Sequence, residues 1–414
     1  MEIKRDKYLT DLINRMHNGL IKVVTGIRRS GKSFLLFHLF RNYLLETGVP
    51  ESHIISIELD QRRYRQFRDP DALLDYIESL IEGRESYYIL LDEVQMLEHF
   101  EETLNSLLHI PNVDIYVTGS NSKFLSKDII TEFRGRGDEI HVFPLMFKEF
   151  MQVYDGDEYH GWMDYVTYGG LPLVAMMKTE EQKIQYLTRL FEETYIKDIR
   201  ERNSIGKIQE LNDLINVLAS AVGSLTNPTR IEATFRSVVQ SDISVNTIRQ
   251  YIEYLEEAFV VHAAQRYDVK GRRYIGTPMK YYFEDVGLRN ARLGFRQTEE
   301  THLMENVIYN ELRARGFQVD VGVVPFRRPT TQERGQLEID FVANLGNRRY
   351  YIQSALQISD MEKEKQEKAS LLKVNDSFKK IVVVKDVIHV QRDESGITTM
   401  SIYDFLLKEN SLEL

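Results

Sequence analysis

Residues 26–33 read Gly-Ile-Arg-Arg-Ser-Gly-Lys-Ser, which is the G-x-x-x-x-G-K-S pattern of a phosphate-binding loop. The glycines allow a tight turn whose backbone N–H groups face a phosphate chain, and a following helix directs its positive N-terminus at the same anion. We expect Lys32 to reach the β- and γ-phosphates and the Ser33 hydroxyl to ligate Mg²⁺. The predicted ATP contacts are Gly26, Ile27, Arg28, Arg29, Ser30, Gly31, Lys32, Ser33 and Phe34.

An apolar run at residues 87–91 ends in two adjacent acids, Asp92 and Glu93. Asp92 would hold Mg²⁺ through water beside Ser33, and Glu93 would act as the general base toward the attacking water. Two acids at an exposed strand end are common, but here a phosphate-binding loop lies about 60 residues upstream. The chain has no Asn-Lys-x-Asp guanine-reading element, so the pair predicts hydrolysis of ATP with Mg²⁺ as the metal.

Polar and basic residues follow the next apolar run, at residues 113–118. Ser120 or Asn121 would position the attacking water near the γ-phosphate, and a plain turn with a helix cap is the alternative. Arg134 or Arg136 would stabilise charge in the transition state, in its own chain or in a neighbouring subunit. A solvated basic loop is the alternative for these two arginines.

The elements that must position these residues alternate along the chain as far as Pro144. Apolar residues at helical spacing predict helices at residues 32–45 and 100–108. Short β-branched runs predict strands at residues 20–25, 53–59, 87–91, 113–118 and 139–143. Alternating strands and helices are typical of an α/β domain with a mostly parallel sheet, and the motifs fall where its strands end.

After Pro144 the pattern becomes mostly helical, and a β-hairpin follows the helices. Three helices and then a hairpin are the order of a winged helix-turn-helix. The helices are predicted at residues 208–218, 230–239 and 244–257, and the β-like runs at 260–267 and 280–283.

The third of these helices and the hairpin tip would supply the contacts if this part of the chain binds DNA. Three acids further along the helix, Glu253, Glu256 and Glu257, would repel a phosphate backbone. A packing module beside the ATPase is therefore the alternative. The residues expected to face DNA are Asn246, Arg249, Lys270, Arg272 and Arg273.

Further motifs complete a resemblance that spans nearly the whole chain. They are Tyr-Gly-Gly-Leu-Pro at 168–172, Thr-Ile-Arg-Gln-Tyr-Ile at 247–252, Tyr-Tyr-Phe-Glu-Asp-Val-Gly-Leu at 281–288 and Glu-Ile-Asp-Phe at 338–341. With the loop and the acidic pair, they make the chain resemble prokaryotic AAA+-related ATPases that carry a C-terminal domain of unknown function. The resemblance implies a P-loop ATPase domain at residues 1–146, a helical and winged-helix domain at 147–295, and a small α/β domain with a restriction-endonuclease-like fold at 296–414.

Nucleases of this implied fold need clustered carboxylates for Mg²⁺ and a lysine near the attacking water. Asp340 matches the strand aspartate, and Glu305 or Glu311 would supply an acid from a helix. However, Gln353 and Ala355 stand where Glu-x-Lys would lie, and Ala355 has no amine. We therefore expect the fold without the nuclease chemistry, with a degenerate site at Glu305, Asp340 and Gln353.

Composition narrows the function classes. The 414 residues include 53 Lys and Arg against 63 Asp and Glu, a net charge of −10, which excludes a protein that coats nucleic acid by charge alone. The absence of cysteine excludes disulfide scaffolds, Cys-ligated zinc and iron–sulfur clusters. No apolar run approaches about 18 residues and the first residues lack the apolar core of a leader, so we expect a cytoplasmic protein without a membrane partner.

Together these patterns predict a Mg²⁺-dependent, AAA+-like ATPase that works as a molecular switch or machine. A homo-oligomer is the arrangement in which an arginine would act on a neighbour's nucleotide. Two alternatives stay open: a DNA-binding protein modulated by ATP, and an active DNA nuclease.

Overall fold

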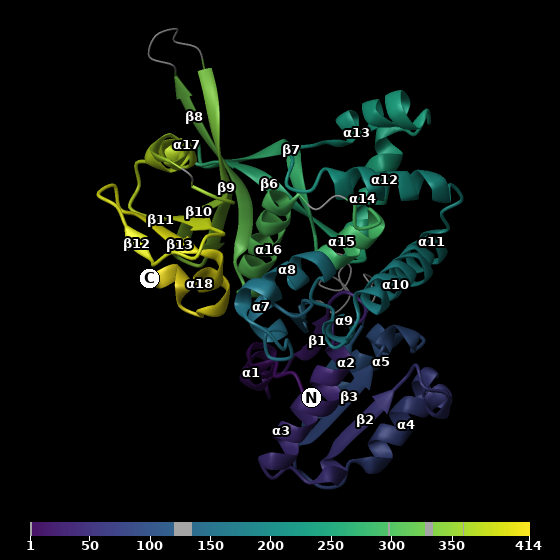
Figure 1. Ribbon diagram of the computed structural model, residues 1–414. Coiled ribbons are helices and arrows are strands. Elements are labelled where there is room, and N and C mark those ends of the chain that lie inside the picture. The colour runs from purple at the N-terminus through teal and green to yellow at the C-terminus, as the bar shows by residue number, and fades with distance from the viewer. Residues whose placement is uncertain (1, 120–134, 297–298, 328–333, 359) are drawn as a thin grey trace. The chain divides into compact units, whose positions relative to one another are not determined.

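The computed structural model describes residues 2–119, 135–296, 299–327, 334–358 and 360–414 (Figure 1). The chain divides into two compact units. The first is Met1–Pro144 with Glu257–Phe259, and the second is Leu145–Glu256 with Val260–Leu414. Each unit contains one of the two β-sheets.

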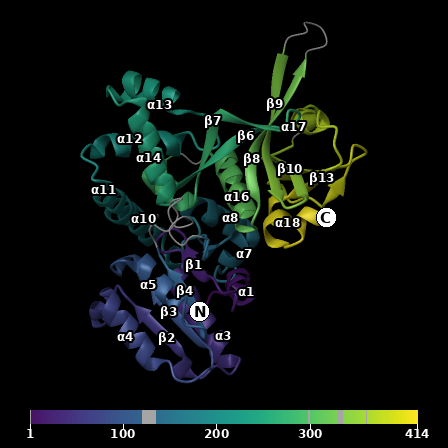
Figure 2. The ribbon, with the colours of Figure 1, turned by 180° about the vertical axis from the view of Figure 1, so that it is seen from behind.

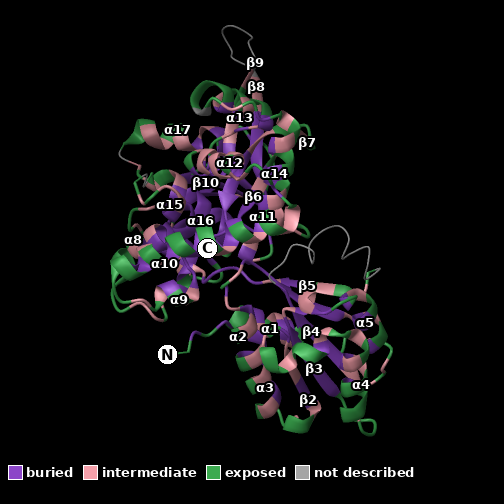
Figure 3. Ribbon diagram, turned by 90° about the vertical axis from the view of Figure 1, so that its right-hand side faces the viewer, coloured by how far each residue is buried: buried purple, intermediate pink, exposed green. Residues whose placement is uncertain are grey.

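The first unit is built around a five-stranded parallel sheet in the order β2-β3-β4-β1-β5. Its strands are β1 (Ile21–Thr25), β2 (Ile54–Glu58), β3 (Tyr87–Asp92), β4 (Val113–Thr118) and β5 (Gly137–His141). The central strands β1, β3 and β4 are buried along nearly their whole length, as parallel strands between two helical layers are (Figure 3). The C-terminal ends of β1, β3 and β4 share one edge, where ligands of such sheets bind.

Helices pack on both faces of this sheet, and successive strand residues contribute to the two faces in turn. Val24 packs with α1 (Asp6–Asn14) and with the helix that follows the loop, and Val23 packs with α4 and α5. That following helix is continuous through α2 (Lys32–Phe34), a π-helical stretch (Leu35–Phe40) and α3 (Arg41–Glu46). The opposite layer is α4 (Pro70–Leu80) and α5 (Phe100–Leu107), and short 3₁₀ turns lie at Glu51–His53, Arg62–Arg68 and Val94–Met96.

The second unit begins with a run of helices. They are α7 (Phe147–Phe150), α8 (Glu158–Tyr168), α9 (Pro172–Ala175), α10 (Glu180–Leu190), α11 (Lys197–Asn203), α12 (Ile208–Ser220), α13 (Pro228–Thr234) and α14 (Val245–Glu257). A further helix, α15 (Val286–Arg292), follows the two strands at residues 261–283. Two π-helical stretches, Phe191–Ile196 and Phe235–Val239, continue α10 into α11 and extend α13.

Two of the sequence motifs, at residues 168–172 and 281–288, pack against each other inside this unit. Asp285 accepts hydrogen bonds from the backbone N–H groups of Gly170 and Leu288, at 2.8 and 2.9 Å, and so caps α15 while it holds the glycine turn. A Cβ on Gly287 would lie 2.0 Å from the carbonyl oxygen of Tyr168. The glycine is therefore needed for the close approach of α15 to α8.

A mixed eight-stranded sheet in the order β12-β13-β11-β10-β9-β8-β6-β7 completes the second unit (Figure 2). Its strands are β6 (Val261–Asp268), β7 (Arg273–Phe283), β8 (Gln318–Arg327), β9 (Arg334–Leu345), β10 (Arg348–Ala355), β11 (Lys379–Val384), β12 (Gln391–Arg392) and β13 (Ile397–Ser401). The helices of this part are α16 (Glu300–Ala314), α17 (Met361–Leu372) and α18 (Ile402–Leu407), with a 3₁₀ turn at Ser411–Glu413.

The predicted fold class is confirmed: a parallel α/β sheet, then a helical region, then a sheet of mixed direction. The hairpin β6–β7 is also part of the eight-stranded sheet, because β6 pairs in parallel with β8 from Arg266 to Asp268. Among the helices of the described residues, we find none that is both long and apolar enough to span a membrane.

Candidate active site

The loop of residues 26–31 joins the C-terminal end of β1 to α2, as the motif requires. Gly26 has φ +137°, and a Cβ built on it would lie 2.2 Å from the carbonyl oxygen of Val142. Gly31 also has a positive φ, of +98°. Both positions therefore demand glycine, the first because the chain after β5 passes directly beside the loop.

Lys32 is buried and its side chain turns back into the loop. Its Nζ donates hydrogen bonds to the carbonyl oxygens of Gly26 and Ile27, at 2.9 and 3.0 Å. The ammonium thus lies on the inner side of the loop that is expected to surround the phosphates, within reach of a β- or γ-phosphate by a side-chain rotation.

Arg5 supports the loop from outside, and no local sequence pattern indicated it. Its guanidinium donates to the carbonyl oxygens of Ser30, at 2.9 Å, and Phe143, at 2.7 Å, and it is buried over the ring of Tyr8. Arg5 therefore ties the phosphate-binding loop to the chain that leaves β5. Its partners are 25 and 138 residues away in the sequence, so spacing alone could not reveal this role.

Asp92, at the end of β3, is brought into contact with the loop. The Ser33 hydroxyl donates to Asp92 Oδ1 at 3.0 Å, and the Thr118 hydroxyl donates to the same oxygen. Burial raises the pKa of Asp92, and the nearby carboxylates of Glu93 and Asp60 raise it further, against the lowering effect of the two hydroxyls. Thr118 ends β4, the strand between β3 and β1, which explains why it reaches the acid.

This donor set fits Mg²⁺, which prefers hard oxygen ligands. Ser33 and Asp92 offer a hydroxyl and a carboxylate already in contact. Carboxylate oxygens of Glu58, Asp60 and Asp92 also lie within 4.8 Å of one another where β2 and β3 end. The pair predicted from the sequence to hold the metal therefore lies together, and the neighbouring acids add negative charge that a divalent cation would offset.

Glu93 follows Asp92 in a left-handed backbone conformation, with φ +49°. Its N–H donates to the Thr118 hydroxyl at 3.1 Å, and its carboxylate accepts a hydrogen bond from the Gln95 amide. Such conformations are uncommon outside glycine and are found frequently at functional sites. The contacts fix both the backbone and the side chain of the residue expected to be the general base.

The remaining predicted ATPase residues are placed as follows. Arg28 is partly buried, Arg29 is exposed, and the Phe34 ring stacks on His38 with 4.9 Å between centroids. Ser120, Asn121 and Arg134 lie outside the described residues. Arg136 is described, and its guanidinium donates to the Asn105 side chain at 3.2 Å.

Arg136 lies at the opposite end of the sheet from the phosphate-binding loop. It directly precedes β5, whose first residue Gly137 pairs with Ile21 at the start of β1, whereas the loop follows Thr25 at the end of β1. Five strand residues at about 3.3 Å each separate the two ends by roughly 16 Å. In this arrangement Arg136 does not reach the loop of its own chain.

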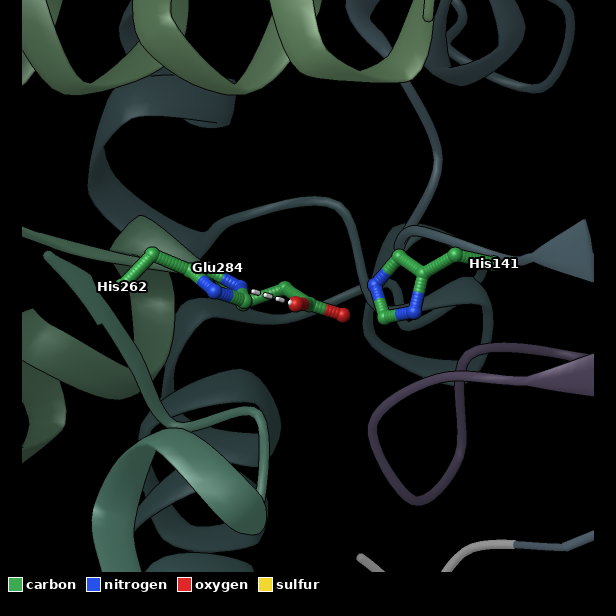
Figure 4. Close-up of side chains that lie close together, drawn as sticks. All are labelled: His141, His262 and Glu284. Carbon is green, nitrogen blue, oxygen red and sulfur yellow. Dashed lines mark hydrogen bonds and ion pairs between the residues drawn. The ribbon is translucent and has the colours of Figure 1, made fainter. Parts of the chain in front are cut away.

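The residues expected to face DNA lie on α14 and at the tip of the β6–β7 hairpin. Asn246 and Arg249 are exposed on α14, and Arg272 and Arg273 are exposed at the tip. Lys270 is exposed as well, and its Nζ donates to the Pro325 carbonyl oxygen at 3.1 Å. At the other end of this hairpin, the buried side chains of His262 and Glu284 are joined by a hydrogen bond of 2.5 Å (Figure 4).

Two of the three degenerate nuclease residues come together in the second unit. Glu305 and Asp340 both lie near the ammonium of Lys280, and Glu338 joins them. Gln353 instead accepts a hydrogen bond of 3.5 Å from the Ser370 hydroxyl. Lys280 was not indicated by the sequence because a single lysine beside an apolar strand end usually faces solvent.

Two family models match successive parts of the chain. Residues 18–151 match the AAA domain family, and residues 159–299 match a domain of unknown function, DUF8612. The first match covers the loop, the acidic pair and all five strands of the parallel sheet. This part of the chain is a AAA+-related P-loop ATPase domain.

An uncharacterized protein of Haemophilus influenzae is 33% identical over 412 residues, covering 98% of this chain and 99% of that protein. The chain belongs to the same family as this Haemophilus protein. An uncharacterized protein of Methanocaldococcus jannaschii is 25% identical, over 95% of this chain and 86% of its own length. Among solved structures, the Aeropyrum pernix Orc1 protein in complex with DNA is 13% identical, with a TM-score of 0.29, and the match covers 70% of this chain and 92% of the Orc1 chain.

Proposed function

We propose that the AAA domain of this protein binds ATP with Mg²⁺ and hydrolyses it to drive a molecular switch or machine. The observation that carries the proposal is the contact of Ser33 and Thr118 with one oxygen of Asp92. It joins the ends of three elements, α2, β4 and β3, at the edge of the sheet where the phosphate-binding loop lies.

Each residue has a role in this proposal. The loop N–H groups and Lys32 bind the phosphates and offset their charge. Ser33 and Asp92 would hold Mg²⁺, which when bound polarises the phosphate oxygens. Glu93 accepts a proton from the attacking water. Thr118 holds the backbone N–H of Glu93, and the Gln95 amide holds its carboxylate.

Phosphate release from ATP tests the proposal. Lys32→Ala should reduce the rate by roughly 10²-fold or more, because one fixed cation is lost from the transferring phosphate. Lys7→Ala is a matched control, since Lys7 is a half-exposed lysine of the same unit that pairs with Asp11. Equal rates for Lys32→Ala and the wild type would refute the proposal.

A second candidate function is DNA binding by the helical part of the second unit, which we infer to be a winged helix. Its support is the element order α12, α13, α14 and hairpin, together with a β-bridge between Thr226 and Met279 of β7. The bridge brings the segment between α12 and α13 onto the hairpin. We propose the ATPase part at residues 1–146, the helical and winged-helix part at 147–295 and the small α/β part at 296–414, with the last two sharing the eight-stranded sheet of the second unit.

Labelled duplex DNA titrated at two salt concentrations tests this candidate. If the winged helix binds DNA, Arg249→Ala and Arg272→Ala should each weaken binding and flatten its salt dependence, because a phosphate contact is lost. Lys148→Ala, a half-exposed lysine on α7, should not. Absence of binding at low salt would dismiss the candidate.

A further inference from the structure

Lys280 of β7 lies among three carboxylates that come from two other elements. Its Nζ is 2.7 Å from Glu305 on α16, and 2.8 and 3.7 Å from Glu338 and Asp340 on β9. Only 3% of Lys280 is exposed, and Glu305 and Asp340 are buried as well. An ammonium with so little access to water depends on these carboxylates for its hydrogen bonds.

The carboxylates make further hydrogen bonds that hold them in place. The Tyr282 hydroxyl donates to the Glu305 oxygen that faces Lys280, at 2.5 Å. The Ser354 N–H donates to the second oxygen of Asp340, at 2.8 Å. Tyr282 is fully buried and stacks on Tyr309, with 4.2 Å between centroids. Lys280, Glu305 and Asp340 are thus enclosed by packed side chains, whereas the Glu338 side chain is 36% exposed and closes the cluster on its solvent side.

The charge state of the cluster follows from the same contacts. Burial acts to lower the pKa of Lys280, but the three carboxylates around it outweigh burial and raise the pKa. Burial and the charge of Glu305 raise the pKa of Asp340. The distances of 2.7 and 2.8 Å from Nζ to Glu305 and Glu338 are those of an ammonium that donates to carboxylates, and an ammonium has no lone pair with which to accept a proton from water.

The acids Glu305 and Asp340 are those that the implied endonuclease-like fold would use to hold a divalent metal. Mg²⁺ requires oxygen ligands at about 2.0–2.1 Å with near-octahedral geometry and keeps several waters. An ammonium at ordinary hydrogen-bond distance from the same oxygens takes up that space. The residues present therefore do not fit a metal ion. Lys280 also does not replace the lysine that the Glu-x-Lys pattern would place on β10, because the amine of Lys280 is already bound by the acids.

We propose that Lys280 is the built-in cation of the Glu305–Glu338–Asp340 cluster, where its side chain takes the place of a metal ion and turns a nuclease-like centre into a structural core. The cluster joins β7 of the hairpin to α16 and β9. It thereby links β7, at one edge of the eight-stranded sheet, to α16 and to β9 of the same sheet. The chemistry of a phosphodiesterase is absent from this cluster, and its role is to fix one part of the unit on the other.

Mn²⁺ bound by nucleotide-free protein, measured by electron paramagnetic resonance, tests the proposal. Lys280→Ala should gain one Mn²⁺ per chain relative to the wild type, and the double variant Lys280→Ala with Asp340→Asn should lose it again. The exposed Lys270, on the same hairpin, gives a matched control: Lys270→Ala should gain none. Fluorescence of Trp162, which is buried in the second unit and is the single tryptophan of the chain, reports whether each variant is folded.

Three outcomes would overturn the proposal. One is the binding of Mn²⁺ by the wild type and its loss in Asp340→Asn. This comparison needs no substitution at Lys280, so it can be made even if Lys280→Ala fails to fold. Another is cleavage of plasmid DNA by the wild type with Mn²⁺ that Asp340→Asn abolishes. The last is a folded Lys280→Ala, or Lys280→Gln, that gains no metal. None of these depends on ATP hydrolysis by the AAA domain.

Discussion

The Thr118 hydroxyl donates a hydrogen bond to the Asp92 carboxylate across the neighbouring strands β4 and β3, and it accepts one from the N–H of Glu93. One small side chain thus contacts both acids of the site. The residue that positions the attacking water was expected two or three positions later, at Ser120 or Asn121, which lie outside the described residues. We expect Thr118 to position the acids themselves.

Thr118→Val removes the hydroxyl and keeps the shape. Hydrogen bonds to charged groups are worth about 1.5–3 kcal/mol, so phosphate release should fall roughly 10- to 100-fold. ATP affinity should change little, because the loop and Lys32 remain. Thr118→Ser, which keeps the hydroxyl, should stay close to the wild type. Wild-type turnover by Thr118→Val would show that the contact has no role in hydrolysis.

Arg5→Met should weaken ATP binding, because the loop loses the guanidinium that holds the carbonyl oxygens of Ser30 and Phe143. We expect an increase in Kd of roughly tenfold, which corresponds to about 1.4 kcal/mol. Fluorescent nucleotide titration measures it. Lys7→Met removes a cation two residues away that pairs at the surface with Asp11, and it should leave the Kd unchanged. Equal Kd values for both variants would contradict a role for Arg5 in shaping the loop.

Asp285 gives the second unit a pH dependence. Burial raises the pKa of this carboxyl to about 6 in the folded protein, against 3.8 for the free side chain. The folded state then holds the proton more tightly than the unfolded state, so this group contributes most stability below pH 4 and loses it as pH rises through about 6. The difference in unfolding free energy between the wild type and Asp285→Asn should fall by ~3 kcal/mol across this range.

Urea unfolding followed by Trp162 fluorescence at several pH values measures this difference for the second unit, which contains that residue. Asp285→Asn is the matched variant because it keeps the size of the side chain and removes the titration. A difference that stays constant, or that grows with pH, would show that Asp285 is ionised as readily in the folded protein as in the unfolded chain.

We expect Arg136 to act on the nucleotide of a neighbouring subunit, because it lies at the end of β5 that is remote from its own loop. Arg136→Ala and Lys32→Ala should each hydrolyse ATP more slowly than the wild type. For Arg136→Ala the turnover rate should fall by as much as ~10³-fold, the loss expected when an arginine that contacts the transferring phosphate is removed. A mixture of the two should recover part of the activity, since mixed assemblies contain intact sites. Wild-type turnover by Arg136→Ala, or no recovery on mixing, would exclude this role.

Local patterns predicted the phosphate-binding loop, the acidic pair and the central strands, because each depends on consecutive residues. Strand β7 was predicted over residues 280–283 and observed from Arg273, because its first half is largely exposed and lacks apolar alternation. Arg5 and Lys280 could not be found in this way. Their partners lie up to 138 residues distant for Arg5 and at least 25 for Lys280, and only the fold brings these groups together.

Glu93→Gln tests the central claim most directly, because the substitution keeps the size and the backbone of the residue and removes only the base. Nucleotide binding and phosphate release are measured on the same preparation with Mg²⁺ present. We predict that Glu93→Gln binds ATP with a Kd close to that of the wild type while phosphate release falls by about 10²–10⁴-fold. Phosphate release at the wild-type rate, or loss of ATP binding together with hydrolysis, would contradict the assignment of Glu93 as the general base of an ATPase.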